Sequence, residues 1–458
     1  MAADILGQDA TAVLAAFARK EFSPAEYVDA VTSRAEQQQS LNTLVGFDPD
    51  HLRQSTLRDD LSGPLAGLPL VIKDNINTAD LPTSAATKAL TGNQTGTDAG
   101  AVALLRTAGA IIGAKANMHE LAFGITSNNA HTGAVRNPYD PTLIPGGSSG
   151  GTAAAIAAGI FPAGLGTDTG GSCRIPAALC GIVGFRPTAG RYPTDGTVPI
   201  SHTKDTPGPM ARSVRDIALL DSILARRAPR ESTRALNTVI LGVPRADLFT
   251  DLDPYVADTI ERQLDALSNA GVRLIDVSLG DVRAHSDAFG LPVVLYEVMR
   301  DLPIYLTEHA PHVSFEELVA NIASPDVADI LRAHQGTGAI PEQVYREAIN
   351  QHRPAIRRIY ASVFKENALD ALIFPTTPRA ASEIGMDQTV PLNARDVPTF
   401  PTFIRHTDLA SNIGAPAISL PCPVGTGLPV GIELDGRVGH DEPLLEIAAL
   451  LEDVMTAC

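Results

Sequence analysis

Two glycine-serine turns lie close together in the first half of the chain and carry the residues best suited to nucleophilic chemistry. The first reads Gly-Gly-Ser-Ser-Gly-Gly over residues 146–151, and the second reads Thr-Gly-Gly-Ser over residues 169–172. Glycine weakens regular elements and is favoured where the backbone must pass close to another group. The pattern predicts acyl transfer by a serine hydroxyl. The successive N–H groups that could converge on the developing oxyanion are those of Thr169, Gly170, Gly171 and Ser172.

The segment between the turns has a suitable length to bring Ser148 and Ser172 together. An alanine-rich stretch at residues 152–158 predicts a helix, which advances about 14 Å from residue 150 at ~1.5 Å per residue. A short strand at residues 162–167 then returns about 16 Å at ~3.3 Å per residue. An out-and-back path of matched length places both serines at one end of the unit.

A serine nucleophile needs a base, and the sequence offers a lysine rather than a histidine. None of the 11 histidines stands in a recognisable nucleophile–base context. Lys73 follows an apolar run at residues 68–72, Leu-Pro-Leu-Val-Ile, that is expected to be a buried strand. At a reference pKa of about 10.4 a lysine is charged and cannot act as a base. Because burial disfavours the charged form, a desolvated Lys73 could accept a proton near neutral pH.

The remaining residues of the two turns are predicted to shape the loops. Asp168 and Arg174 flank the second turn and are expected to hold it, and Gly147 and Ser149 belong to the scaffold of the first. Cys173, beside Ser172, is expected to pack beneath the loop as a small apolar residue rather than to react.

Strand-like and helix-like segments alternate along the chain, which indicates an α/β fold around a central sheet. Strands are expected at residues 68–72, 110–112, 162–167, 238–243, 274–277, 371–374, 417–420 and 430–434. Helices are expected from the capping-box pattern that begins at Ser23, and at residues 101–108, 152–158, 255–270 and 443–452. Residues 1–60 are expected to be a helical N-terminal segment, residues 65–191 a core, and residues 285–353 a helical cap insertion.

The composition is that of a globular protein, with 44% apolar and 19% charged residues. A net charge of -17 argues against nucleic acid as a partner. No apolar run approaches the roughly 20 residues of a membrane-spanning helix, and the first residues show no signal peptide. The four scattered cysteines form neither a disulfide framework nor a metal-ligand spacing. We therefore expect a cytoplasmic protein without nucleic-acid or membrane partners.

These segments together resemble the amidase-signature family. Residues 146–177 follow its Gly/Ser-rich signature almost residue for residue, and Lys73 stands where the family has its catalytic lysine. Similarity at residues 205–213, 372–376 and 427–432 extends over nearly the whole chain. The resemblance implies one amidase domain, residues 1–458, with residues 65–191 as its signature core, built as an α/β/α sandwich around a mixed β-sheet.

The resemblance also implies a mechanism without metal or cofactor. Ser172 attacks the amide carbonyl, and Ser148 relays its proton to Lys73 and back to the leaving nitrogen. Water then hydrolyses the acyl-enzyme through the same relay. In the family the bridging serine follows a cis peptide bond, which here joins Gly147 to Ser148.

Residues 198–209 and 403–414 look most like indoleacetamide and mandelamide hydrolases within the family. This similarity implies hydrolysis of a small aryl or arylalkyl amide to an acid and ammonia or an amine. Phe123, Ile125, Ile200 and Phe403 are the candidates for the pocket of the acyl group. The Asp-Leu-Ala at residues 408–410 departs from the expected Asp-Pro-Gly, which leaves the exact substrate open. Anilides, carbamates and urea-like compounds stay open as substrates, because the relay can protonate any small nitrogen leaving group.

Other functions fit the sequence less well. The glutaminase subunit of a tRNA amidotransferase would carry Arg-Val-Ser-Arg-Tyr-Gly where residues 190–196 read Gly-Arg-Tyr-Pro-Thr-Asp-Gly. An α/β-hydrolase would need a buried strand before its Gly-x-Ser-x-Gly, but residues 137–145 are a proline-rich loop. His119-Glu120 lacks the second histidine of a zinc helix, and His309 with His312 suits a polar surface. A homodimer is expected only because symmetric assembly is common.

Overall fold

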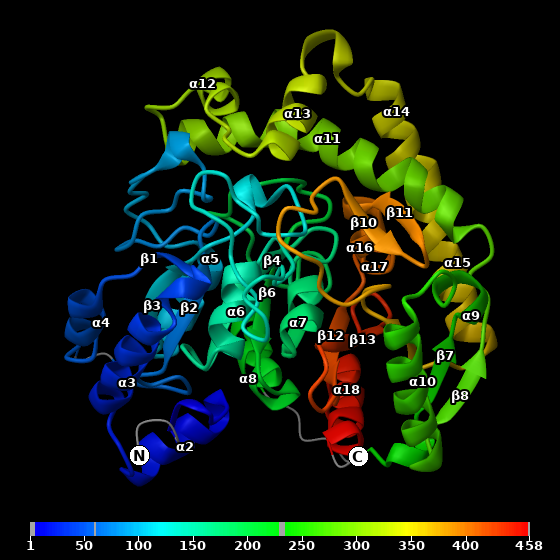
Figure 1. Ribbon diagram of the computed structural model, residues 1–458, viewed down its shortest axis with the longest axis horizontal. Helices are drawn as coiled ribbons and strands as arrows, with labels where there is room; N and C mark the ends of the chain where they lie inside the picture. The colour runs from blue at the N-terminus through cyan, green and yellow to red at the C-terminus, as the bar shows by residue number, and fades with distance from the viewer. Residues whose placement is uncertain (1–4, 59–60, 229–233, 457–458) are drawn as a thin grey trace.

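A mixed sheet of 11 strands forms the centre of the computed structural model, which describes residues 5–58, 61–228 and 234–456 (Figure 1). The ends of the predicted segment 1–60 and the last cysteine, Cys458, lie outside the described residues. The strand order is β1-β3-β2-β4-β6-β5-β12-β13-β9-β7-β8. These strands are β1 (Leu44–Gly46), β2 (Pro69–Lys73), β3 (Ile111–Ala116), β4 (Ala163–Asp168), β5 (Val183–Arg186), β6 (Thr206–Ala211), β7 (Ile240–Val243), β8 (Arg273–Asp276), β9 (Ala371–Pro375), β12 (Ala417–Cys422) and β13 (Val430–Asp435). A separate hairpin pairs β10 (Thr389–Leu392) with β11 (Arg395–Pro398).

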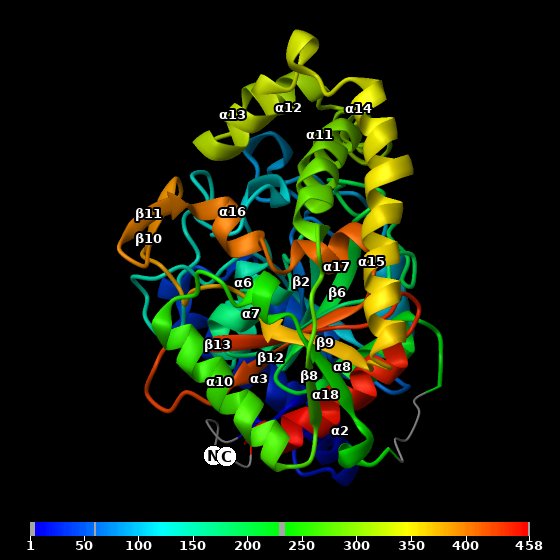
Figure 2. The same cartoon turned by 90° about the vertical axis from the view of Figure 1, so that its right-hand side faces the viewer.

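Helices cover both faces of the sheet (Figure 2). They are α2 (Ala10–Arg19), α3 (Pro24–Gln37), α4 (Pro49–Ser55), α5 (Gly100–Thr107), α6 (Gly150–Ala157), α7 (Arg174–Cys180), α8 (Val214–Leu224), α9 (Arg245–Leu248), α10 (Pro254–Asn269), α11 (Val282–His309), α12 (Phe315–Ala320), α13 (Pro325–Ala333), α14 (Glu342–Glu347), α15 (Arg353–Glu366), α16 (Thr399–Ile404), α17 (Asp408–Ile413) and α18 (Asp441–Thr456). Right-handed crossovers from β2 to β3 and from β3 to β4 run in opposite directions along the sheet, so α5 and α6 lie on opposite faces. Helix α7 packs beside α6, whereas α8 packs beside α5 and α18. The predicted α/β/α sandwich is confirmed.

Strands β2 and β4 position the two turns that the sequence singled out. Every residue of both strands is buried, as expected for parallel strands covered by helices on each side. The two strands pair in parallel, with Ile72 opposite Leu165. Their carboxyl ends therefore meet at one edge of the sheet, where Lys73 ends β2 and Asp168 ends β4.

Strand β6 lies in the middle of the sheet although it contains Pro207 and Pro209. The sequence predicts no strand here, because proline cannot donate to the ladder of a central strand. Strand β6 pairs with β4 along its whole length but with β5 only at Met210 and Ala211. The two prolines are two residues apart, so their backbone nitrogens face the same edge of the strand. Both lie before Met210, where the pairing with β5 begins, so no ladder hydrogen bond from β5 is lost at either position.

The segment predicted as a helical cap, residues 285–353, contains most of α11 together with α12, α13 and α14, and α11 runs across the top of the molecule (Figure 1). Helix α11 has 28 residues and continues through Pro292 and Pro303. It packs on α15 and α17, which ties the segment to the rest of the fold. Within the described residues, no helix combines the length and the apolar character needed to cross a membrane.

Candidate active site

Lys73 and Ser148 are in direct contact at the end of β2. Lys73 Nζ donates hydrogen bonds to Ser148 Oγ at 2.8 Å and to Thr167 Oγ1 at 2.7 Å. Asn75 Nδ2 donates to the same Thr167 hydroxyl at 3.1 Å. All four side chains are buried. Thr167 and Asn75 orient the lysine, and nothing in their sequence pattern distinguishes them from ordinary buried polar residues.

The electrostatics of Lys73 match the expectation from sequence. Burial lowers the pKa of its ammonium group from the usual 10.5 to about 7, and the carboxylates of Asp168 and Asp205 oppose this shift only in part. A group with such a pKa is present in both protonation states near neutral pH, which general acid–base chemistry requires. Lys73 can therefore both accept and return a proton.

Backbone contacts join the first turn to the second. The peptide bond between Gly147 and Ser148 is cis, as the resemblance implies. Ser149 N–H donates to the carbonyl oxygen of Ser172 at 3.1 Å, and Ser149 Oγ donates to the carbonyl of Thr167 at 3.2 Å. The two serines are thus brought to one place, as the length argument predicts. Ser172 is 9% exposed, whereas Ser148 is fully buried, so Ser172 is the more accessible of the two serines.

The second turn is closed by side chains from two distant segments. Gly171 N–H donates to Asp168 Oδ1 at 3.0 Å, and Thr407 Oγ1 donates to the carbonyl of Gly170 at 2.6 Å. Gly171 has φ +136°, and a Cβ there would lie 2.2 Å from Thr407 Oγ1, so only glycine fits. The N–H of Gly171 is thus engaged within the turn by Asp168, and its part in an oxyanion hole stays a prediction. In the described chain, the N–H groups of Thr169, Gly170 and Ser172 make no such bond.

Asp168 and Arg174 hold this turn through a buried ion network. Arg174 contacts both oxygens of Asp168, at 3.0 and 2.9 Å, and also donates to Glu433 Oε1 at 2.5 Å. Arg186 donates to Asp168 Oδ1 at 3.0 Å and to its carbonyl oxygen at 2.6 Å. Burial alone would raise the pKa of Asp168, but the guanidinium groups of Arg174 and Arg186 outweigh it and hold that pKa well below its usual value. Asp168 therefore stays ionised and serves as a fixed acceptor.

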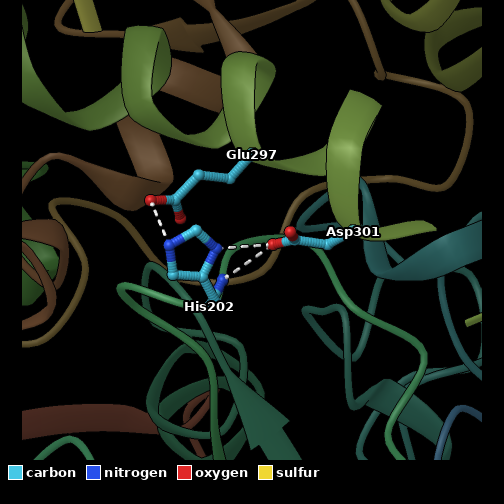
Figure 3. Close-up of side chains that lie close together, drawn as sticks. All are labelled: His202, Glu297 and Asp301. Atoms are coloured by element: carbon cyan, nitrogen blue, oxygen red, sulfur yellow. Dashed lines mark hydrogen bonds and ion pairs between the residues drawn. The ribbon is translucent and has the colours of Figure 1, made fainter. Parts of the chain in front are cut away.

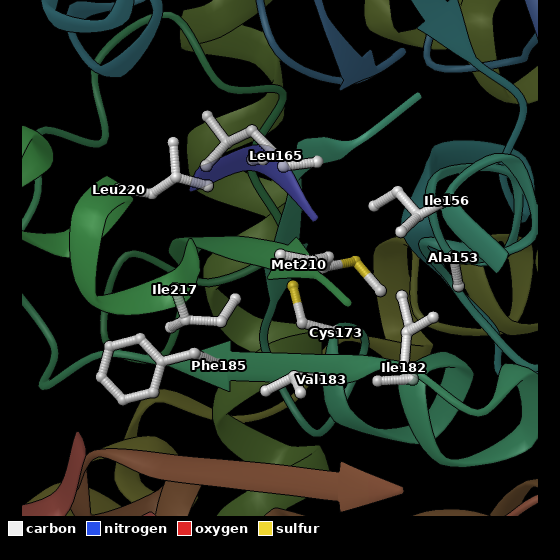
Figure 4. Close-up of a cluster of buried hydrophobic side chains, with 14 of the residues drawn as sticks. Ala153, Ile156, Leu165, Cys173, Ile182, Val183, Phe185, Met210, Ile217 and Leu220 are labelled. Carbon is white, nitrogen blue, oxygen red and sulfur yellow. The ribbon is translucent and has the colours of Figure 1, made fainter. Parts of the chain in front are cut away.

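Cys173 lies in a hydrophobic cluster beneath the turn (Figure 4). Burial raises the pKa of its thiol to about 12, so the reactive thiolate is disfavoured. Its Sγ lies 3.5 Å from the carbonyl oxygen of Gly208. The labelled neighbours are Ala153, Ile156, Leu165, Ile182, Val183, Phe185, Met210, Ile217 and Leu220.

The four predicted pocket residues fall into two hydrophobic clusters beside the turns. Ile125 and Phe403 share one cluster, and Ile200 and Phe123 share another. A Cβ on Gly147 would lie 2.9 Å from the backbone carbonyl carbon of Ile125. Phe403 is fully buried, so it supports this region from beneath.

The side chain next to the second turn is that of Ile404, the residue after Phe403. A Cβ on Gly170 would lie 2.6 Å from Ile404 Cδ1. Sequence reasoning missed Ile404, because the orientation of α16 decides which of two adjacent apolar residues faces the turn.

Comparisons with known proteins agree with this geometry. A sequence profile of the Amidase family matches residues 26–445. This chain belongs to the amidase-signature family. The amidase is 41% identical over 447 residues to an indoleacetamide hydrolase of Allorhizobium ampelinum, covering 96% of each chain. It is 41% identical to a mandelamide hydrolase of Pseudomonas putida, covering 94% of this chain and 88% of the relative. A solved amidase structure superimposes with a TM-score of 0.87 at 35% identity, over 98% of this chain and 100% of the other.

Proposed function

We propose that this amidase hydrolyses a small aryl or arylalkyl primary amide through a Ser172 acyl-enzyme, with Ser148 and Lys73 as its proton relay. The observation that carries the proposal is the buried contact of Lys73 Nζ with Ser148 Oγ at 2.8 Å. The aryl acyl group is proposed because the similar proteins include indoleacetamide and mandelamide hydrolases and because apolar clusters flank both turns.

The first half of the reaction forms the acyl-enzyme. Ser172 Oγ bonds to the amide carbon as its proton passes to Ser148 Oγ, while the proton of Ser148 passes to neutral Lys73. The carbonyl oxygen becomes an oxyanion, which the N–H groups of Thr169, Gly170 and Ser172 can stabilise. The relay then returns the proton to the amide nitrogen, the C–N bond breaks, and ammonia leaves.

The second half regenerates the enzyme. A water oxygen bonds to the acyl carbon while its proton passes through Ser148 to Lys73. The tetrahedral intermediate collapses as the bond to Ser172 Oγ breaks, and the relay returns the proton to that oxygen. One amide and one water thus give one acid and one ammonia, and each relay residue ends in its starting state.

Ammonia release from indole-3-acetamide, mandelamide, benzamide and glutamine tests the proposal, with Ser172→Ala as the control variant. Turnover of the aryl amides that disappears in Ser172→Ala is the expected result. Activity retained by Ser172→Ala would refute the assignment of the nucleophile. Turnover of glutamine alone would show that glutamine is the substrate and would favour the glutaminase subunit of an amidotransferase instead of an aryl amidase.

A further inference from the structure

A short strap, residues 200–205, lies between the turn at residues 169–172 and helix α11. Asp205 Oδ1 accepts a hydrogen bond from Thr169 Oγ1 at 2.6 Å. Asp205 Oδ2 accepts the backbone N–H groups of Ile200 and Ser201, each at 2.8 Å. The carboxylate therefore fixes the strap on one side and the first residue of the turn on the other.

Helix α11 fixes the strap through one buried carboxylate, that of Glu297. Glu297 is fully buried and accepts hydrogen bonds from Ser201 Oγ at 2.5 Å, from Thr203 N–H at 3.0 Å and from Thr203 Oγ1 at 2.5 Å. Tyr345, from α14, donates to the same group at 2.9 Å. A carboxylate with this many donors is satisfied only while the strap is docked.

His202 adds contacts of its two ring nitrogens to this attachment (Figure 3). Its Nε2 lies 3.2 Å from Glu297 Oε1, and its Nδ1 lies 2.7 Å from Asp301 Oδ2. These three residues form a possible metal-ligand set by type, since each offers one ligand atom within 4.8 Å of the others. The two carboxylates contact different ring nitrogens of His202, and the oxygens of Glu297 already accept several donors from the strap, so the cluster is part of the strap's attachment.

We propose that Asp205 is a positioning residue for the oxyanion hole and that Glu297 on α11 holds it in place. The inference rests on the proposed function, in which the N–H groups of Thr169 and Gly170 face the developing oxyanion. Three separate contacts fix the turn: Asp168 takes the N–H of Gly171, Thr407 takes the carbonyl of Gly170, and Asp205 takes the side chain of Thr169. The contact at Thr169 connects the turn, through the strap, to the helical segment above it.

A double-mutant cycle tests the pair, with Thr169→Val and Asp205→Ala measured singly and together on the most rapidly hydrolysed amide of the panel. The oxyanion forms in the transition state and is absent from bound substrate, so weakening its support affects the chemical step and not binding. Each single variant should therefore lower kcat about 10- to 100-fold with KM unchanged. The double variant should be no slower than the slower single variant, since both remove the same contact. Unchanged kcat, a loss confined to KM, or multiplicative losses in the double variant would overturn the proposal.

Two controls separate this result from other failures. Thr32→Val makes the same exchange at a buried threonine of α3 whose hydroxyl has no hydrogen-bond partner among the described residues, and it should keep full kcat. Ser172→Ala distinguishes the two proposals: if it is active, the proposed function fails, whereas if it is inactive and Thr169→Val is normal, only the positioning role fails. Glu297→Gln should lower kcat about fivefold, and full kcat in this variant would overturn the part of the proposal that involves α11.

Discussion

Replacing Lys73 by methionine should destroy the activity and yet stabilise the protein at neutral pH. Methionine has about the length of lysine and no charge, so the change removes the proton acceptor and little volume. The folded chain holds Lys73 with a pKa of about 7, against 10.5 for an ordinary lysine. Between these values the unfolded chain binds a proton that the folded chain has released, so the stability of the wild-type protein rises with pH across this window.

The size of the effect follows from that difference. At pH 7 the burial of Lys73 costs about 4 kcal/mol, from ~1.4 kcal/mol per pH unit. Methionine leaves the Ser148 hydroxyl without its lysine partner, which costs about 1–2 kcal/mol. Lys73→Met should therefore be more stable than the wild type by about 2–3 kcal/mol at pH 7, and slightly less stable at pH 10, where the cost in the wild type has fallen below about 1 kcal/mol.

Thermal melting followed by far-ultraviolet circular dichroism at pH 7, 8.5 and 10 measures this difference, since the chain has no tryptophan for fluorescence. Lys88→Met, at an exposed lysine, is the matched control and should melt with the wild type at every pH. Ammonia release by Lys73→Met should fall by several orders of magnitude. A melting difference that does not change with pH, or a variant that is less stable than the wild type at pH 7, would refute the pKa argument.

Three further predictions concern the relay base, a second buried lysine and the second turn. The value of kcat/KM should fall tenfold per pH unit below about pH 7, because protonated Lys73 cannot accept a proton, and a flat profile from pH 5 to 8 would contradict the assignment of the base. Lys115→Met should lower the stability at pH 7 by no more than about 2 kcal/mol in urea unfolding, because two effects offset each other: removing a lysine whose pKa burial lowers to about 8 relieves about 3 kcal/mol, and leaving buried Asp74, 3.9 Å away, without its cation costs roughly 3–5 kcal/mol; a loss above about 4 kcal/mol would contradict this. Gly171→Ala should lower kcat more than about 100-fold through the contact with Thr407, judged from the cost of losing an oxyanion donor. Gly385→Ala, also at positive φ but in open space, should keep full kcat, and equal losses in both variants would show backbone strain rather than the contact to be the cause.

Local patterns in the sequence are sufficient for the central part of the fold. The apolar run before Lys73 and the matched lengths between the two turns predict β2, α6 and β4 and their common edge. Strand β6 is missed because two prolines argue against a central strand. The fold accommodates both prolines because β5 pairs with β6 only at Met210 and Ala211, beyond the prolines. The hairpin β10–β11 is missed because its four-residue strands are short and largely exposed.

The partners of the candidate site are harder to predict because they come from distant segments. Asp168 and Arg174 were expected to scaffold the turn, but Arg186 and Glu433 complete that network and carry no local signal. The commitment of Gly171 N–H to Asp168 depends on side-chain geometry within the turn, which composition does not encode. Asp205 stands in a segment that resembles the family, yet its contact with Thr169 emerges only when the strap is placed in space.

The ion network around Arg174 also has a consequence for how the protein is made. The ribosome adds Lys73, Ser148 and Ser172 early, but Thr407 and Glu433, which fix the second turn, are added long afterwards. A nascent chain that stops before these residues contains every member of the relay and lacks the contacts that hold the turn. Unfinished chains, and chains truncated by a protease ahead of Thr407, should hydrolyse no amide, so a cell that makes this amidase is not exposed to its activity until synthesis is nearly complete.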